Sequence, residues 1–409
     1  MKISFNSYPR AFNGLMGMYF LNRMGASLIW PFIAIYIHEQ TGASLTTIAV
    51  LTSLQAVTSI VGTSLVSLWM DRSGRKIPML IGLIGTTILL LTMSQADQIW
   101  QWAILIIFYG TLMPIFMIGT NASIADLIEQ EGRTGAYALA RTLANIAIAI
   151  GPMIGGFLIV QSHMFSYYAT AAINAVMAVI VLLFWTETLP SRKRKNDEAQ
   201  VEYVPESVTG EFGAMLTDRP FMVFCGLFIL LEVGAAMVFN MLAVFVKETY
   251  GILENQYAYI LGLNAVMVVL FQYAVTRLTR RYKPYTLIAA GSVFYTVGLV
   301  GFGLSRTLPH FLLSMGILTI GELLTAPTAT ALVARLAPAE MRARYMGVFA
   351  LLYPIGAGIG PLLGGLLSEQ YGPSAMWFGG AFAAACAVIG FWAMIPRQKA
   401  KREEAVYTA

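Results

Sequence analysis

Residues 45–95 contain two apolar stretches on either side of a short charged break. They read LTTIAVLTSLQAVTSIVGTSLVSLWM, then DRSGRK, then IPMLIGLIGTTILLLTMSQ. Wound as helices, both stretches are long enough to cross a hydrocarbon core about 30 Å thick. Four of the six residues in the break are charged, so it belongs in water. The pattern predicts two membrane-spanning helices joined by a tight polar turn.

The same alternation of apolar stretch and polar break continues along the whole chain. Of the 409 residues, 57% are hydrophobic and only 11% are charged, whereas a soluble domain carries about 25% charged residues. About twelve stretches are long enough to span a membrane. A barrel pattern of alternating polar and apolar residues is absent, and helices satisfy their backbone hydrogen bonds internally. The chain is therefore predicted to be an all-α membrane protein.

The basic residues predict the orientation, because Lys and Arg beside a span resist translocation. We expect 22 of the 26 basic residues on one side of the membrane. Only Lys247 and Arg306 lie on the other side, and Arg23 and Arg141 fall inside spans. Both chain termini are therefore expected in the cytoplasm, with the protein in the cell membrane. The net charge of +5 reflects this topology and not a nucleic-acid surface.

The longest polar break divides the predicted spans into six and six. It contains SRKRKNDEAQVEYVPES, which is charged and poor in apolar residues, as expected of a solvated linker. We therefore expect an N-terminal six-helix bundle over residues 1–187, a cytoplasmic linker over 188–219 and a C-terminal six-helix bundle over 220–409.

An offset of 209 positions brings the two halves into register, which indicates a duplicated unit. It places the motif GPxxGG of Gly151–Gly156 on that of Gly360–Gly365. It also places Arg23 on Glu232. The alternative, a chance pairing of glycines in glycine-rich helices, accounts less well for so many agreements at one offset.

The break at residues 71–76 resembles the signature loop of the major facilitator superfamily. Asp71-Arg72-Ser73-Gly74-Arg75-Lys76 matches the core D-R-x-G-R-K, although Ser67 stands where the motif usually opens with glycine. The resemblance implies twelve transmembrane helices in two pseudo-symmetric six-helix bundles, with substrate bound at mid-membrane. It also implies that Asp71, Arg72, Gly74, Arg75 and Asp126 form a cytoplasmic gate. The alternative is a solvated ion cluster that only sets topology.

A second resemblance is to the twelve-span multidrug:proton antiporter branch. Gly347, Gly356 and Gly360-Pro361-x-x-Gly364-Gly365 look like its antiporter motif, which is normally found in the fifth span. In the fifth span itself only the end survives, as Gly151-Pro152-x-x-Gly155-Gly156. We expect all these glycines and prolines to serve helix packing. Gly321-Glu322, followed by Thr325-x-Pro327, looks like a subgroup with a functional glutamate in the tenth span.

Ionisable groups inside the spans are the expected functional residues. A charge at mid-bilayer costs about 2.5–3.5 kcal/mol on insertion scales and normally faces a cavity or a partner. Arg23, Glu232 and Glu322 share one level, about 17–20 Å deep. Glu322 is expected to carry the proton and to anchor a cationic substrate, with Glu232 as a second coupling residue. A permanent structural ion pair is the alternative for each.

Further polar residues within the spans are candidates for substrate binding. Arg23 and Glu232 would form either a direct ion pair or two walls of a polar site. The other candidates are Asn22, Gln55, Arg141, Asn145, Asn240 and Asn264. The alternative for each amide is a structural hydrogen bond between packed helices.

These observations predict a proton-coupled secondary transporter that exports lipophilic or cationic drugs by alternating access. Two alternatives stay open: a proton symporter or uniporter for a sugar, peptide or other metabolite, and a non-transporting membrane receptor or scaffold. Enzymatic motifs, metal-ligand spacings and nucleotide-binding loops are absent from the sequence, so we expect no enzyme, cofactor or metal. The expected partners are a small-molecule substrate, protons and the lipid bilayer. The oligomeric state is left open, and a monomer is compatible with the sequence.

Overall fold

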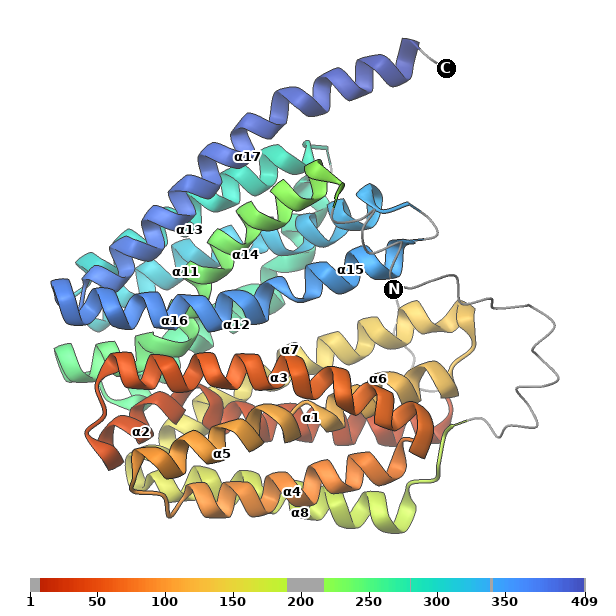
Figure 1. Ribbon diagram of the computed structural model, residues 1–409, viewed down its shortest axis with the longest axis vertical. Coiled ribbons are helices and arrows are strands. Elements are labelled where there is room, and N and C mark those ends of the chain that lie inside the picture. The colour runs from red at the N-terminus through yellow and green to blue at the C-terminus, as the bar shows by residue number, and fades with distance from the viewer. Residues whose placement is uncertain (1–7, 190–216, 280, 339–340, 408–409) are drawn as a thin grey trace. The chain divides into compact units, whose positions relative to one another are not determined.

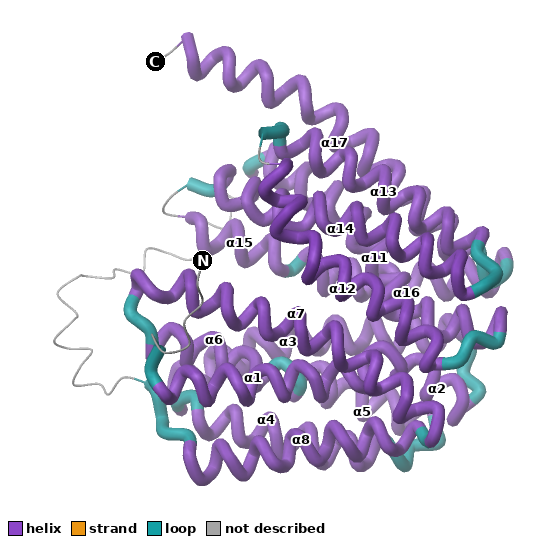
Figure 2. The backbone as a smooth tube through the Cα atoms, turned by 180° about the vertical axis from the view of Figure 1, so that it is seen from behind, coloured by secondary structure: helices purple, strands orange, loops and turns teal. Residues whose placement is uncertain are grey.

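The computed structural model describes residues 8–189, 217–279, 281–338 and 341–407. Every regular element within them is a helix, as the tube in Figure 2 shows. Most of the expected linker, residues 190–216, lies outside the described residues. The chain divides into two compact units (Figure 1). The N-terminal unit is Met1–Gly42 with Leu54–Glu206, and the C-terminal unit is Ala43–Ser53 with Ser207–Ala409. The grouping of Ala43–Ser53 with the C-terminal unit differs from the expected boundary.

The described helices follow one another in the order expected of membrane spans. The first half contains α1 (Arg10–Ile29), η2 (Trp30–Phe32), α2 (Ile33–Thr41), α3 (Leu45–Ser73), α4 (Lys76–Met93), α5 (Ile99–Leu112), α6 (Ile115–Leu127), α7 (Gln130–Gln161) and α8 (His163–Phe184). The second half contains α11 (Arg219–Tyr250), α12 (Glu254–Thr279), α13 (Pro284–Leu304), α14 (Leu308–Leu336), α15 (Arg342–Ala350), α16 (Leu352–Tyr371) and α17 (Ala375–Tyr407).

In the described part of the chain, these elements form 12 segments long and apolar enough to cross a membrane. Three segments are built from more than one helical piece, and a proline lies at each interruption. Pro31 is in the 3-10 turn between α1 and α2, and Pro114 separates α5 from α6. Helix α15 ends at Ala350. Pro354, four residues later, has no N–H, so it cannot donate the helical hydrogen bond to the Ala350 carbonyl.

Small residues let two pairs of helices approach closely, and the two pairs are equivalent. A Cβ atom added at Gly151 of α7 would lie 3.0 Å from the Met24 carbonyl of α1. In the C-terminal unit, a Cβ at Gly360 of α16 would overlap the Val233 carbonyl of α11. The offset of 209 also relates Met24 to Val233. The repeat in the sequence is therefore a repeat of helix packing.

At the next turn the helices of the N-terminal pair approach more closely than those of the C-terminal pair. A Cβ at Gly155 would overlap the Leu28 carbonyl, and one at Gly364 would lie 3.4 Å from the Met237 side chain. Both helices continue through their prolines, Pro152 and Pro361. Gly156 and Gly365 are buried.

Gly347 corrects one expectation. It is exposed, and a Cβ at this position would meet nothing within 4 Å. Gly347 precedes the interruption at Leu351, so it belongs to α15 and not to the tightly packed helix α16. A helix-packing role at this position is not supported.

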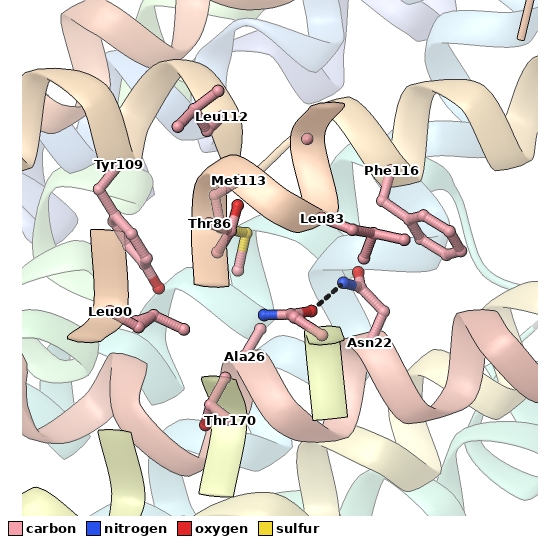
Figure 3. A pocket seen from close by; sticks show the side chains of 12 residues that line it. Asn22, Ala26, Leu83, Thr86, Leu90, Tyr109, Leu112, Met113, Phe116 and Thr170 are labelled. Carbon is pink, nitrogen blue, oxygen red and sulfur yellow. Dashed lines mark hydrogen bonds between the residues drawn. The ribbon is translucent and has the colours of Figure 1, made fainter. Parts of the chain in front are cut away.

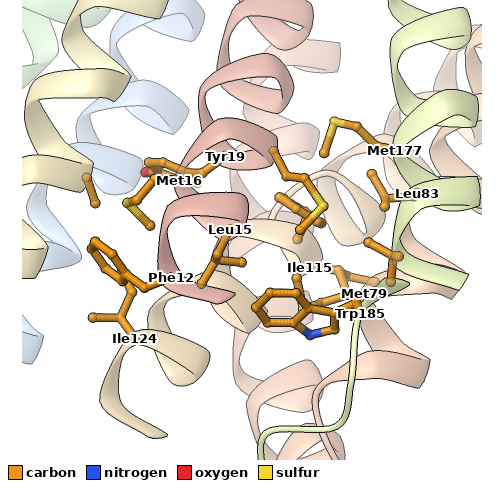
Figure 4. Close-up of a cluster of buried hydrophobic side chains, with 14 of the residues drawn as sticks. Phe12, Leu15, Met16, Tyr19, Met79, Leu83, Ile115, Ile124, Met177 and Trp185 are labelled. Carbon is orange, nitrogen blue, oxygen red and sulfur yellow. The ribbon is translucent and has the colours of Figure 1, made fainter. Parts of the chain in front are cut away.

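The core of the N-terminal unit forms around one face of α1. Phe12, Leu15 and Met16 belong to one buried cluster with Met79 and other side chains from α4, α6 and α8 (Figure 4). Large apolar side chains on other faces remain exposed, among them Leu65, Leu183 and Phe184 at 61%, 65% and 76%. Exposed apolar surface of this extent fits contact with lipid and not with water.

Alanine at Gly155 is expected to destabilise the protein by about 1–3 kcal/mol, because its Cβ would overlap the α1 backbone. The measurement is the apparent melting temperature of the detergent-purified protein. Gly17→Ala is the matched control, because Gly17 is exposed and a Cβ there meets nothing within 4 Å. Equal melting temperatures for the two variants would contradict the packing argument.

Candidate functional site

Arg75, in the turn between α3 and α4, joins three elements of the N-terminal unit. Its Nε atom lies 3.2 Å from Oδ2 of Asp126, near the end of α6. Its Nη1 atom donates to the Met70 carbonyl of α3 at 2.7 Å. Arg75 is 8% exposed, so this pair is shielded from water. The structure thus brings together Arg75 and Asp126, two of the expected gate residues.

Glu187, which follows α8, supplies a carboxylate at the start of α4. Its Oε1 accepts from the Arg75 backbone N–H at 2.8 Å, and its Oε2 accepts from the Lys76 N–H at 3.1 Å. Its Oε1 also accepts from the backbone N–H groups of Thr188 and Leu189. Free N–H groups at a helix start favour a negative charge. Partial burial opposes ionisation of Glu187, but the four backbone N–H groups outweigh it and lower its pKa below the usual range.

Thr188 connects the two acidic residues of this region. Its hydroxyl lies 3.2 Å from Asp126 Oδ2 and 3.3 Å from the hydroxyl of Ser123. We call Arg75, Ser123, Asp126, Glu187 and Thr188 the Arg75 cluster. The cluster ties the segment after α8 to the turn before α4 and to the end of α6.

Two independent observations explain why position 74, next to the Arg75 cluster, is a glycine. Its φ of +93° lies in the region that side chains disfavour. A Cβ there would also overlap the Glu187 carboxylate. Arg72 is exposed, and the side chain of Asp71 lies outside the described residues, so its expected gating role stays a prediction.

The C-terminal unit contains a second polar site around Glu322 of α14. Asn264 of α12 donates through Nδ2 to Oε2 of Glu322 at 2.8 Å and contacts Oγ1 of Thr319 at 2.9 Å. The Thr319 hydroxyl in turn donates to the Met315 carbonyl of its own helix. Glu322 is partly buried. This arrangement orients Glu322 from a neighbouring helix.

Glu232 of α11 lies near Glu322. The two carboxylates are close enough to interact electrostatically, and the buried Tyr295 of α13 lies within range of both. A Cβ at Gly356 of α16 would lie 2.8 Å from the Glu232 carbonyl carbon, so the Glu232 backbone is packed against that helix. Among the described residues of this unit, no basic side chain pairs with either glutamate. We call Glu232, Asn264, Tyr295, Thr319 and Glu322 the acidic site.

Helix α14 carries a proline one turn after the acidic site. Pro327 has no N–H, so the Leu323 carbonyl four residues earlier loses its helical partner. Gln272 of α12 donates to this carbonyl at 3.2 Å. Helix α12 therefore holds α14 at two points, through Asn264 at Glu322 and through Gln272 at the proline.

The other expected binding residues are distributed over both units. Asn22 of α1 donates to Oδ1 of Asn174 in α8 at 3.3 Å. Asn240 donates to Ala236 in its own helix, so its donor serves local structure. Arg141 is exposed on α7, and Gln55 and Asn145 are partly buried. None of the last three side chains has a hydrogen bond within the described N-terminal unit.

The N-terminal unit contains a small pocket beside the break between α5 and α6 (Figure 3). Its polar lining comes from Asn22, Thr86, Tyr109, Thr170 and Asn174. The remaining lining is apolar and includes Met113 and Phe116. The pocket therefore combines apolar side chains with a few polar groups.

Several of these residues were missed by the sequence analysis. Glu187 and Gln272 act on backbone groups, and only the packing of distant segments shows which backbone group each one reaches. The sequence did contain a signal for the partner of Gln272, because a proline at position 327 predicts that the Leu323 carbonyl lacks its helical donor. Tyr109 and Asn174 resemble ordinary core residues when only the sequence is considered.

Glu187→Gln is expected to destabilise the protein by about 1 kcal/mol at neutral pH, the usual value of a lost helix cap. Because folding lowers the Glu187 pKa, its contribution is present above the unfolded pKa of about 4.3 and is lost as the pH falls through the folded pKa. Melting temperatures of wild type and variant should therefore converge on acidification. Glu129→Gln, exposed and without a cap bond, is the control. A difference independent of pH would refute the charged cap.

Gln272→Leu is expected to cost about 0.6 kcal/mol, an average for hydrogen bonds between membrane helices. Pro327→Ala restores the N–H that can bond the Leu323 carbonyl, so Gln272→Leu should cost less in that background. The measurement is a double-mutant cycle of unfolding free energies. Additive effects would show that Gln272 does not compensate for the proline.

Comparison with known proteins gives the family. The model of the Major Facilitator Superfamily matches residues 15–319 and 230–406. Among solved structures, the nucleoside transporter NupG is 16% identical, with a TM-score of 0.77, and 94% of this chain and 99% of that chain are covered. At this identity the likeness shows the fold alone.

Two curated relatives cover nearly the whole chain. The Na(+), Li(+), K(+)/H(+) antiporter of Planococcus maritimus is 25% identical over 92% of this chain and 94% of its own length. Multidrug resistance protein 1 of Bacillus subtilis (strain 168) is 24% identical over 86% of this chain and 87% of its own length. With a family match over most of its length and 12 segments able to span a membrane, this chain belongs to the major facilitator superfamily and is a multi-pass membrane transporter, not an enzyme.

Proposed function

We propose that this transporter exports lipophilic, often cationic, compounds in exchange for protons. The observation that carries the proposal is the acidic site, where Glu232 and Glu322 have no basic partner among the described residues of their unit. A carboxylate without a counter-charge is costly to ionise inside a membrane. A proton or a cationic substrate neutralises it, and binding of one favours release of the other.

The surroundings of Glu322 support its part in this exchange. Asn264 holds one carboxylate oxygen, which orients the group in both of its protonation states. Pro327 lies five residues further along α14, where the helix has lost one internal bond. Motion of α14 at this point would move Glu322, so we propose that alternating access changes its exposure to water.

The relatives support export of drugs but also favour a second candidate function. Multidrug resistance protein 1 is named for drug resistance, and the Planococcus maritimus relative is named as an antiporter of Na⁺, Li⁺ or K⁺ against H⁺. Carboxylate, amide and hydroxyl oxygens, all present in the acidic site, also suit alkali cations. Exchange of an alkali cation for protons is therefore the second candidate.

The distribution of basic residues supports a location in the cell membrane with both termini in the cytoplasm. In this orientation the Arg75 cluster lies on the cytoplasmic side. We propose that it stabilises one state of the transport cycle, because its bonds join the ends of α3, α4, α6 and α8.

Glu322→Gln is expected to abolish the pH-driven component of transport, because an amide cannot exchange a proton. The assay uses proteoliposomes with an imposed pH gradient and measures ethidium movement, with Na⁺ and K⁺ movement in parallel. Glu129→Gln, exposed and far from the acidic site in sequence, should leave transport unchanged.

Two results would overturn the proposal. Full pH-dependent transport by Glu322→Gln would remove Glu322 from proton coupling. Movement of alkali cations but not ethidium by the wild-type protein would favour the second candidate. Failure of both assays, with a purified protein that melts cooperatively, would contradict proton-coupled exchange of either class.

A further inference from the structure

Arg23 is a cation inside the membrane without an acidic partner in its own unit. It lies in the middle of the first span, about 20 Å along the helix from Arg10. Its Nε atom is buried and has no hydrogen-bond partner. No ion pair or hydrogen bond joins Arg23 to another described residue of the N-terminal unit. Every Asp and Glu between residues 8 and 189 lies at or near a helix end. A guanidinium with an unpaired nitrogen at this depth would be stabilised by a nearby anion.

Tyr109 connects Arg23 to the pocket of the N-terminal unit. The Tyr109 side chain lines the pocket, and its hydroxyl is within electrostatic range of Arg23. Tyr109 is 2% exposed, and Figure 3 shows its hydroxyl directed toward the interior of the pocket. It has no hydrogen bond within the described N-terminal unit. Asn22 and Ala26, on either side of Arg23 in α1, also line the pocket, so the segment of α1 that carries Arg23 borders it.

The pocket lining also contains other groups that can donate hydrogen bonds. Asn174 is 4% exposed, and its Oδ1 accepts from Asn22, which leaves its own N–H groups without a partner in the described unit. The Thr86 hydroxyl has no partner there either. Unused donors near a partly buried cation match a ligand group with several acceptor oxygens. A carboxylate is such a group.

We propose that Arg23, together with Tyr109 in the adjoining pocket lining, binds the anionic group of a substrate. The transported compounds would then include carboxylic acids and zwitterions in addition to cations. This inference rests on the proposed transport function and adds a substrate class to it. We assign the acceptor of the Arg23 donors to a carboxylate on the substrate, and the experiment below distinguishes it from a lipid phosphate and from an acidic side chain of the protein.

The experiment compares two ligands that differ only in the anionic group. One is a fluorescent zwitterionic xanthene dye with a free carboxylate, and the other is its methyl ester, which is only a cation. Binding to the full-length purified protein is measured by fluorescence polarisation, and transport is measured in proteoliposomes. The variants are Arg23→Gln, Arg23→Lys and Tyr109→Phe. Arg10→Gln, an exposed charge change in the same helix, is the control.

Arg23→Gln should weaken binding of the carboxylate dye by about tenfold or more, the loss expected for a charge-assisted hydrogen bond, and should leave binding of the ester unchanged. Arg23→Lys should retain part of the difference, because the charge remains but the fork geometry is lost. Tyr109→Phe should weaken the carboxylate dye less strongly, in the same direction. Arg10→Gln should bind both dyes as the wild type does.

Three outcomes would overturn the proposal. Equal losses for both dyes would show that Arg23 is held by an acidic side chain of the protein and is structural. Unchanged binding of both dyes would exclude Arg23 from the site. An Arg23→Gln effect seen only in vesicles with phosphatidylglycerol, and not in pure phosphatidylcholine, would assign the acceptor to lipid phosphate. If Arg23→Gln does not fold, Arg23→Lys and Tyr109→Phe give the same comparison.

The two proposals fail separately in this design. Transport of the ester but not of the acid by the wild-type protein contradicts the anion site and leaves proton-coupled export of cations intact. Binding of the acid through Arg23, without pH-driven transport of either dye, contradicts the proposed function and leaves the anion site intact.

Discussion

The structure depends on one constraint: a backbone inside a hydrocarbon layer has to satisfy its hydrogen bonds within its own segment. Helices meet this requirement through their internal hydrogen bonds, and a proline within a helix removes one of these bonds. The proposed functional groups lie close to two such prolines. Pro327 leaves the Leu323 carbonyl free, and Gln272 compensates from a neighbouring helix one turn from Glu322. Pro114 separates α5 from α6, and the pocket of the N-terminal unit lies beside that break. Both polar sites thus lie close to a proline that removes a helix hydrogen bond.

The two halves share a packing scaffold but differ in charge. Glycines in α7 and α16 contact equivalent carbonyls in α1 and α11, at Met24 and Val233. One position earlier on each of these helices, Arg23 stands in the N-terminal unit and Glu232 in the C-terminal unit. Duplication of a helix pair thus preserves the close contacts, while a single side chain beside them sets the sign of the charge. We propose that this difference lets one transporter accept both acidic and basic groups.

The Arg75 cluster shows how much of a site can be predicted from the sequence. The resemblance to the signature loop placed Arg75 and Asp126 in one cytoplasmic gate, and the structure pairs them. The carboxylate at the start of α4 was not expected to be that of Glu187, which lies more than a hundred residues further along the chain. Its partners are backbone N–H groups, and these have no signature in the sequence. The position of Gly347 was misjudged for a related reason, since a glycine pattern does not show where a helix is interrupted.

The sequence by itself determined the twelve spans, the duplication and the presence of ionisable groups at mid-membrane, because hydropathy, repeat offsets and the cost of buried charge are properties of residue order. Only the tertiary structure decided which of these groups have partners. It joined Asn264 to Glu322 and Gln272 to a free carbonyl, and it left the buried Nε of Arg23 without a partner in its unit. Hydrogen bonds act over about 3 Å between segments far apart in the chain, and that proximity is set by packing.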